Sequence, residues 1–172
     1  INMSDISAGR LKTDDFLQGG VREIYFFNYL DDAFTVSANV ATAINASLTA
    51  CYKYAIQGDG NTLTESVATD KKTGTKVNTQ TLVAQLKQIN SATNVELDVL
   101  LQTDVSAVYK DYNGQYRFVA EYGFNVTSTA EAVTGGARTD FNGYNVTLVA
   151  ETLNLAPSLD ASTVTAFLAL VA

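Results

Sequence analysis

The sequence of 172 residues contains no histidine, a single cysteine and a single proline. Without histidine it cannot form a Cys/His dyad, a Ser/His/Asp triad or a metal site with imidazole ligands. Cys51 has no partner for an intrachain disulfide, and free cysteine is among the most often buried residue types. We therefore expect Cys51 to be a buried strand residue and the protein not to be an enzyme. The sequence nominates no catalytic, cofactor-binding or metal-ligating residue.

Charged residues are scarce as well. They make up 17% of the chain, against roughly 25% in an average globular protein, while apolar residues make up 47%. A surface rich in Thr, Asn, Ser and Ala can be buried against a partner without the desolvation cost of stranded charges. The composition therefore predicts a chain that folds and that packs against copies of itself.

The charge that is present is mainly negative, with 18 acidic and 11 basic residues and a net charge of −7. The basic residues are scattered and only Lys71 and Lys72 are adjacent, whereas a protein that grips a phosphate backbone needs a basic stripe. No apolar run approaches the roughly 20 residues of a membrane span, and the polar start lacks the order of a signal peptide. We expect no membrane partner and no specific binding to DNA.

The chain divides into three parts. Residues 1–20 are polar and end in a Gly-Gly pair, which predicts an N-terminal arm joined flexibly to the rest. Residues 21–157 carry the strand patterns and form the predicted β-rich core domain. Residues 158–172 follow the only proline, and their apolar end, Val164 to Ala172, predicts a tail that docks on the core or on a neighbour.

Alternating polar and apolar residues predict strands over most of the core. The strand at 21–30 is partly apolar on both faces, which is typical of a strand covered on both sides. Residues 34–45 are predicted to form a strand as well, although their alanines leave a short helix open as an alternative. The other predicted strands are 48–57, 62–70, 77–89, 105–110, 115–121, 124–133 and 144–153.

Turn chemistry sets the borders of these strands. Asp31-Asp32 predicts a turn, Gly58–Asn61 a hairpin turn, and Asp70–Lys76 an exposed hairpin tip. Asn113-Gly114, between two aromatic strands, predicts a tight type I′ hairpin because both residues accept positive φ.

One helix is predicted. Thr93-x-x-Glu96 matches a capping box, and apolar residues crowd onto one short helix over residues 94–102. Several short strands and one capped helix are typical of a mainly β fold of two packed antiparallel sheets, a sandwich or an open barrel, flanked by that helix.

Features that could carry chemistry have plainer explanations. The pairs Asp14-Asp15 and Asp31-Asp32 could bind a divalent cation but lack EF-hand spacing, so solvated turns account for them better. Gly58-Asp59-Gly60 and Gly135-Gly136 are not followed by Lys-Ser or Lys-Thr and predict turns without a phosphate site. Nine Tyr and eight Phe could form a carbohydrate platform, although their alternate positions favour core packing.

The element order from Val77 to Leu153 resembles that of a known group. A long strand, a short helix (NVELDVLL), an Asn-Gly hairpin (VYKDYNGQYRFVAEYGFNV), a Gly-rich link and a closing strand (DFNGYNVTLVAE) follow one another. This order resembles virion structural proteins of tailed bacteriophages and is most similar to tail tube subunits. The resemblance implies two sheets flanked by a helix, subunits closing into rings, and rings stacked as a conduit for DNA.

We therefore expect a self-assembling structural protein of a virion, put together in the host cytoplasm, that contacts copies of itself and other virion proteins. A neck, connector or capsid decoration protein is the nearest alternative. A carbohydrate-binding or adhesin module is an alternative of another class, and a glycosidase working through carboxylates alone is a further one. The arm and the tip Asp70–Lys76 are expected to make intermolecular contacts, and a tube lumen should carry neutral or negative charge.

Overall fold

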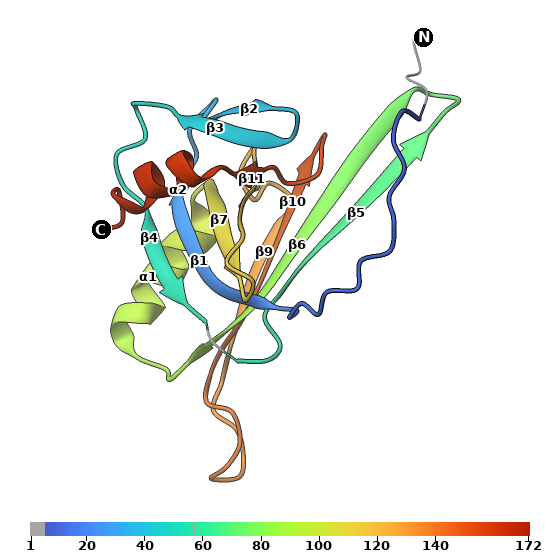
Figure 1. Cartoon of the computed structure of the whole chain (residues 1–172). Helices are drawn as coiled ribbons and strands as arrows, with labels where there is room; N and C mark the ends of the chain where they lie inside the picture. The colour runs from blue at the N-terminus through green and yellow to red at the C-terminus, as the bar shows by residue number, and fades with distance from the viewer. Residues whose placement is uncertain (1–5, 57) are drawn as a thin grey trace.

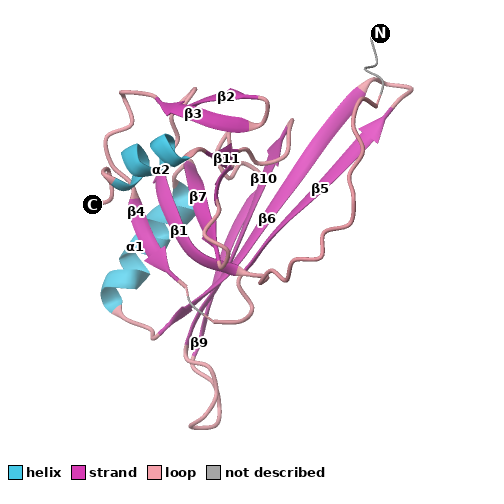
Figure 2. Cartoon of the chain, in the orientation of Figure 1, coloured by secondary structure: helices cyan, strands magenta, loops and turns pink. Residues whose placement is uncertain are grey.

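The computed structural model describes residues 6–56 and 58–172 and has a mainly β fold of two sheets and two helices (Figures 1 and 2). The sheets do not close into a barrel. The prediction of two packed sheets is confirmed, although one pair of strands, β11 and β3, is parallel. Within the described ranges, neither helix is long and apolar enough to cross a membrane.

The larger sheet has seven strands in the order β2-β3-β11-β8-β7-β1-β4. Strand β1 lies between β7 and β4 in this sheet and is buried along most of its length on both faces, as predicted. The strands are β1 (Val21–Asn28), β2 (Phe34–Ser37), β3 (Val40–Ile44), β4 (Tyr52–Ala55), β7 (Val105–Asp111), β8 (Tyr116–Val119) and β11 (Ser158–Leu159).

The smaller sheet has four antiparallel strands in the order β5-β6-β10-β9. The long strand β6 and its partner β10 form its middle, and the hairpin of β5 and β6 extends away from the rest of the molecule (Figure 1). The strands are β5 (Thr62–Asp70), β6 (Thr75–Lys87), β9 (Thr127–Val133) and β10 (Gly143–Thr152).

The main core lies between the two sheets. Ile24 of β1, Leu82 of β6 and Leu148 of β10 are almost completely buried there, because alternate residues of each strand point inward. Helix α1 (Ser91–Gln102) adds Leu97 and Leu100 to the same core.

A second core lies on the other face of the larger sheet, under helix α2 (Ala161–Leu168). It is mainly aromatic: Phe27 stacks on Phe118 at 6.0 Å between ring centroids, and Phe167 of α2 packs edge-on against Phe27. Asp160 caps α2 by accepting a hydrogen bond from the backbone of Thr163. The C-terminal segment is therefore packed on the body of the molecule through Phe167, which is fully buried.

Two predicted strands differ most from the structure in their extent. Residues 34–45 form a hairpin, β2 and β3, because Ala38 and Asn39 turn the chain with φ of 50° and 61°. Residues 48–57 form a strand only over Tyr52–Ala55, with one isolated bridge at Cys51, and residue 57 lies outside the described residues.

The predicted hairpin at Gly58–Asn61 was also wrong. This segment links the two sheets, because β4 pairs with β1 whereas β5 pairs with β6. Asn61 is buried here, and its side chain donates to the Ile56 and Gly58 carbonyls and accepts from the Gln85 backbone.

The predicted helix forms at the predicted place, but its N-cap residue is not the predicted Thr93. Helix α1 begins at Ser91, because the side chain of Asn90 accepts a hydrogen bond from the Thr93 backbone at 2.7 Å. Thr93 therefore lies inside the first turn. A second helix, α2, was not predicted at all.

The Asn-Gly hairpin forms between β7 and β8 as predicted, but its turn type differs. The loop has three residues, Tyr112 to Gly114, and only Gly114 has a positive φ, of 82°. A three-residue loop with glycine in the left-handed region is the next commonest hairpin after type I′. The predicted tip between Asp70 and Lys76 was correct, and it closes the hairpin of β5 and β6.

Candidate functional site

The four-stranded sheet has one face in the core and one face that the described elements leave uncovered. In β6, Asn78, Gln80, Leu82 and Ala84 are buried, so their neighbours point the other way. Both helices pack elsewhere, α1 in the main core and α2 in the second one. We call the uncovered face the outer sheet face; its residues are Thr62, Thr64, Ser66, Ala68, Val77, Thr79, Thr81, Val83, Gln85, Lys87, Thr127, Thr129, Glu131, Asn145, Thr147, Val149 and Glu151.

The outer sheet face is dominated by threonine in continuous cross-strand rows. One row runs Thr64, Thr81, Val149, Thr127, and the next runs Thr62, Val83, Thr147, Thr129. Its charged residues are Lys87, Glu131 and Glu151, which leave a net charge of −1. This is a broad, weakly charged surface of short side chains.

Both edges of this sheet are unpaired in the described chain. Strand β5 lies at one edge and β9 at the other, so each offers backbone N–H and C=O groups. Neither strand contains proline or lysine, the residues that commonly block edge-to-edge pairing. Since all three pairings in the sheet are antiparallel, β5 and β9 run in opposite directions.

The distal half of the β5–β6 hairpin protrudes with both of its faces exposed. Val67 and Val77 are 42% and 40% exposed, and every other residue from Ser66 to Val77 is exposed as well. Asp70 closes the tip by accepting hydrogen bonds from the backbones of Lys72 and Thr73. A two-stranded ribbon without a packing partner is marginally stable in water. The hairpin therefore offers two faces for a partner.

A buried polar network anchors the base of this hairpin. The carboxylate of Glu65 accepts hydrogen bonds from the Gln80 side chain and the Ala156 backbone, both at 2.8 Å. Gln80 in turn accepts from the Ala120 backbone at 2.8 Å, and Asn78 donates to the Asn154 carbonyl. Because Asn78 and Gln80 are almost completely buried, these bonds fix the direction in which the hairpin leaves the body.

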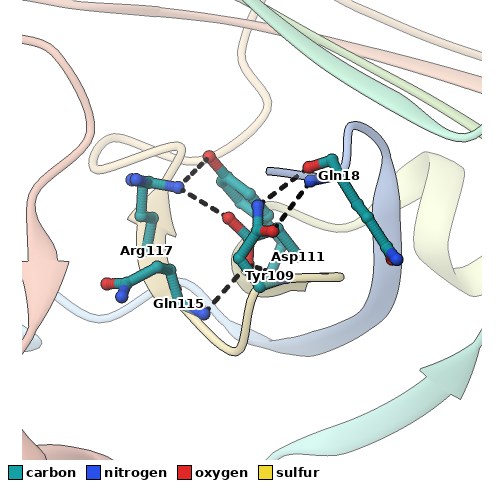
Figure 3. Close-up of polar contacts among 6 residues, drawn as sticks. Gln18, Tyr109, Asp111, Gln115 and Arg117 are labelled. Atoms are coloured by element: carbon teal, nitrogen blue, oxygen red, sulfur yellow. Dashed lines mark hydrogen bonds and ion pairs between the residues drawn. The ribbon is translucent and has the colours of Figure 1, made fainter. Parts of the chain in front are cut away.

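The N-terminal arm is attached to the body at a defined point (Figure 3). The side chain of Asn113 accepts from the Gln18 backbone N–H at 3.0 Å and donates to the Gln18 carbonyl at 2.8 Å. Gly20 lies against the ring of Tyr112, where a Cβ atom would be 3.2 Å from that ring. The loop between β7 and β8 thus holds residues 18–20, which we call the arm root.

An ion pair between Arg117 and Asp111 stabilises this loop (Figure 3). Arg117 lies 3.3 Å from the Asp111 carboxylate and also donates to the hydroxyl of Tyr109. The other oxygen of Asp111 accepts from the backbones of Asn113 and Gln115. Burial raises the pKa of the Tyr109 hydroxyl above its usual value.

Beyond its root, the arm is exposed and has no regular secondary structure between residues 6 and 19. Its large apolar side chains are exposed as well: Ile6 is 96%, Leu11 90%, Phe16 101% and Leu17 77% exposed. Four such side chains on one short segment are unusual for a chain that works alone. The body of the same chain leaves these side chains uncovered.

The residues with potential chemistry are not brought together. Asp14-Asp15 lie in the arm and Asp31-Asp32 in a turn after β1, and no group of three or more Cys, Asp or Glu side chains within the described ranges could hold a metal ion. Cys51 is buried, as predicted, and burial raises the pKa of its thiol to about 11. Its thiol is therefore unreactive at neutral pH.

No protein-family model, no curated protein and no solved structure matches this chain. The outer sheet face, the two free edges of the four-stranded sheet and the arm are the features that bear on its function. Sequence reasoning separated the two faces of β6 correctly but could not tell which one lies in the core. It missed the arm root, since nothing in the sequence links Gln18 to Asn113.

Proposed function

We propose that this protein is a self-assembling structural subunit whose copies join through the edges of the four-stranded sheet. In its most specific form the proposal is a bacteriophage tail tube subunit, with rings of copies stacked as a conduit for DNA. The role is structural, and the proposal includes no catalysis.

The observation that carries the proposal is the pair of free edges, β5 and β9. Because these strands run in opposite directions, β9 of one copy can pair antiparallel with β5 of the next and extend the sheet without a break. Such head-to-tail pairing uses two different surfaces, so it generates a closed ring when the rotation between copies is right. The outer sheet face would then line the ring on one side.

The chemistry of that face supports a conduit. A wall of threonine, with a net charge of −1 in each copy, offers no basic stripe that would hold a phosphate backbone. The protruding hairpin supports stacking, because its two exposed faces and its tip can reach beyond one ring into the next. The association with a virion rests on the resemblance of the segment from Val77 to Leu153 to tail tube subunits.

Electron microscopy and size-exclusion chromatography of the purified protein test the proposal directly. We expect rings or tubes. Substitution of Thr129 by Lys on the β9 edge should reduce assembly, because lysine on an edge strand opposes pairing. The matched control is Val95→Lys on helix α1, which belongs to neither edge strand and where the side chain is 62% exposed. This control should assemble as the wild type does.

Other outcomes distinguish the alternatives. A compact monomer at all concentrations would contradict the proposal and favour a carbohydrate-binding or adhesin module. A single ring that never stacks would favour a neck or connector protein, and binding to preformed capsids without rings would favour a decoration protein. Deletion of residues 1–17 is expected to leave a folded monomer that no longer assembles.

A further inference from the structure

A groove of about 830 Å³ lies between the protruding hairpin and the β2–β3 hairpin. One wall carries Val67 and Lys76 of the protruding hairpin, the other carries Val36 of β2, and Leu155 and Glu121 complete the lining. Val36, Val67 and Leu155 are between 42% and 49% exposed. The groove therefore has apolar side chains on both walls, and the polar groups of Lys76, Glu121, Asn39 and Asn154 lie among them.

The two walls are held apart by contacts at the base. Glu65 and Gln80 fix the protruding hairpin, as described above, and Phe118 at the floor is buried in the second core. Since β2 is a free edge of the seven-stranded sheet, one wall also offers unpaired backbone groups. An extended peptide with apolar side chains is the kind of ligand that suits such a groove.

We propose that this groove holds the N-terminal arm, residues 6–17, of a second copy of the chain. The arm is extended, and its apolar side chains, among them Leu11 and Phe16, are almost fully exposed in the single chain. Its charges also match, because the basic residues Arg10 and Lys12 precede the acidic pair Asp14-Asp15, and the groove offers Glu121 and Lys76. This inference rests on the proposed self-assembly and names one of its interfaces.

The length of the arm fits this role. Twelve extended residues span about 40 Å, whereas the nine residues of β5 span about 30 Å. In Figure 1 the arm runs along the outer side of β5, and the β2–β3 hairpin lies across the opening on the other side of the protruding hairpin. An arm fixed at Gln18 can therefore extend past its own subunit.

Photo-crosslinking in the full-length protein tests the inference. The photoreactive amino acid p-benzoyl-phenylalanine replaces Phe16, and protein labelled with heavy isotopes is mixed with unlabelled protein before irradiation. We expect crosslinked peptides that contain residues from 36–39, 67–76 or 154–157, with one light and one heavy partner. Crosslinks within one chain, crosslinks to other regions or no crosslinks in the purified protein would overturn the proposal.

A double variant of the groove tests whether the crosslink depends on the apolar side chains of its walls. Val67→Asp combined with Leu155→Asp should reduce the intermolecular crosslink at least tenfold, while Val95→Asp on α1 should leave it unchanged. All three positions are between 42% and 62% exposed, so the fold should persist, which circular dichroism can verify. An unchanged crosslink in the double variant would contradict the inference.

The same samples separate this inference from the proposed function. Rings without the arm–groove crosslink would refute the inference alone. The crosslink in dimers that never form rings would refute ring assembly and leave the arm interface in place.

Discussion

The side chain of Asn113 holds the backbone of Gln18 at both its N–H and its C=O group. These two bonds join residues 95 positions apart, and they mark the boundary between an exposed arm and a packed body. The β7–β8 loop, which lies far from the arm in the sequence, therefore sets the position of the arm root. A substitution in this loop can release the arm without changing any core residue.

Asn113→Ala should release the arm root and leave the body folded. We expect faster hydrogen exchange at the Gln18 amide and faster proteolysis near Gly19, with little change in the melting temperature. Asn125→Ala is the matched control, because it removes a side-chain bond to the Glu151 backbone elsewhere on the surface. Equal exchange at Gln18 in both variants would show that the two bonds do not hold the arm.

Gly143→Ala should destabilise the fold. A Cβ atom at Gly143 would overlap the carbonyl oxygen of Leu86 on the paired strand β6 and crowd the Phe141 ring. Overpacking of this kind costs about 1–3 kcal/mol of unfolding free energy, measurable by urea denaturation. Gly136→Ala is the control, since its nearest atom would be 3.8 Å away. Similar denaturation midpoints for both variants would contradict the steric argument.

Gly114→Val should also destabilise the fold, for a different reason. The space around Gly114 is open, so the cost comes from its φ of 82°, which a β-branched residue resists. We expect a loss of about 1–2 kcal/mol. Gly114→Asn should lose less, because asparagine tolerates the left-handed region. Unchanged thermal stability of the valine variant would refute the prediction.

Local sequence patterns predicted the parts of the fold that depend on residues close together in the sequence. The alternation of β6 and the turn at Asp70 are short-range signals, and both strand and tip were predicted correctly. The turn at Ala38-Asn39 escaped prediction because alanine is rarely found at positive φ. Helix α2 escaped because its Thr and Val residues favour strands, whereas contacts from distant parts of the chain, among them the burial of Phe167 in the second core, stabilise the helix.

The candidate assembly surfaces required information that no local pattern holds. Asn78 and Gln80 alternate with threonines, and from the sequence either set could face solvent. The contacts that bury the two amides come from Glu65, Ala120 and Asn154, which lie on other parts of the chain. Strand order at the sheet edges depends on the same long-range pairings.

The stability of the protein should depend on the ionisation of Glu23. Burial raises the pKa of this carboxyl, but hydrogen bonds from Tyr25 and Lys53 outweigh it, so the pKa lies below 4.5. A lowered pKa contributes stability above the unfolded value and loses it as pH falls through the folded value.

Glu23→Gln should therefore cost about 1–3 kcal/mol at pH 7, and the difference from the wild type should shrink as pH falls below about 4.5. Urea denaturation between pH 3 and pH 7 measures this difference. Tyr25→Phe removes one of the two donors and should show a weaker pH dependence of the same sign. A difference that stays constant with pH would contradict the assignment.

The outer sheet face should repel DNA weakly, if it lines a tube. Its charged groups are Lys87, Glu131 and Glu151, so each copy contributes −1 to the wall. At physiological salt this repulsion extends about 8 Å, enough to keep a duplex off the wall without closing a wider bore. Affinity for a phosphate backbone grows with the number of charges neutralised, so a basic wall would hold DNA at each contact.

Assembled wild-type protein should therefore not retain short duplex DNA in a co-sedimentation assay at moderate salt. Glu131→Lys combined with Glu151→Lys changes the face from −1 to +3 and should produce retention at low salt that is lost as salt rises. The control is Asp98→Lys combined with Asp104→Lys, two exposed residues outside the outer sheet face, which adds the same charge to the chain. If wild-type assemblies retain DNA, or if both double variants retain it equally, the outer sheet face is not the wall of a conduit.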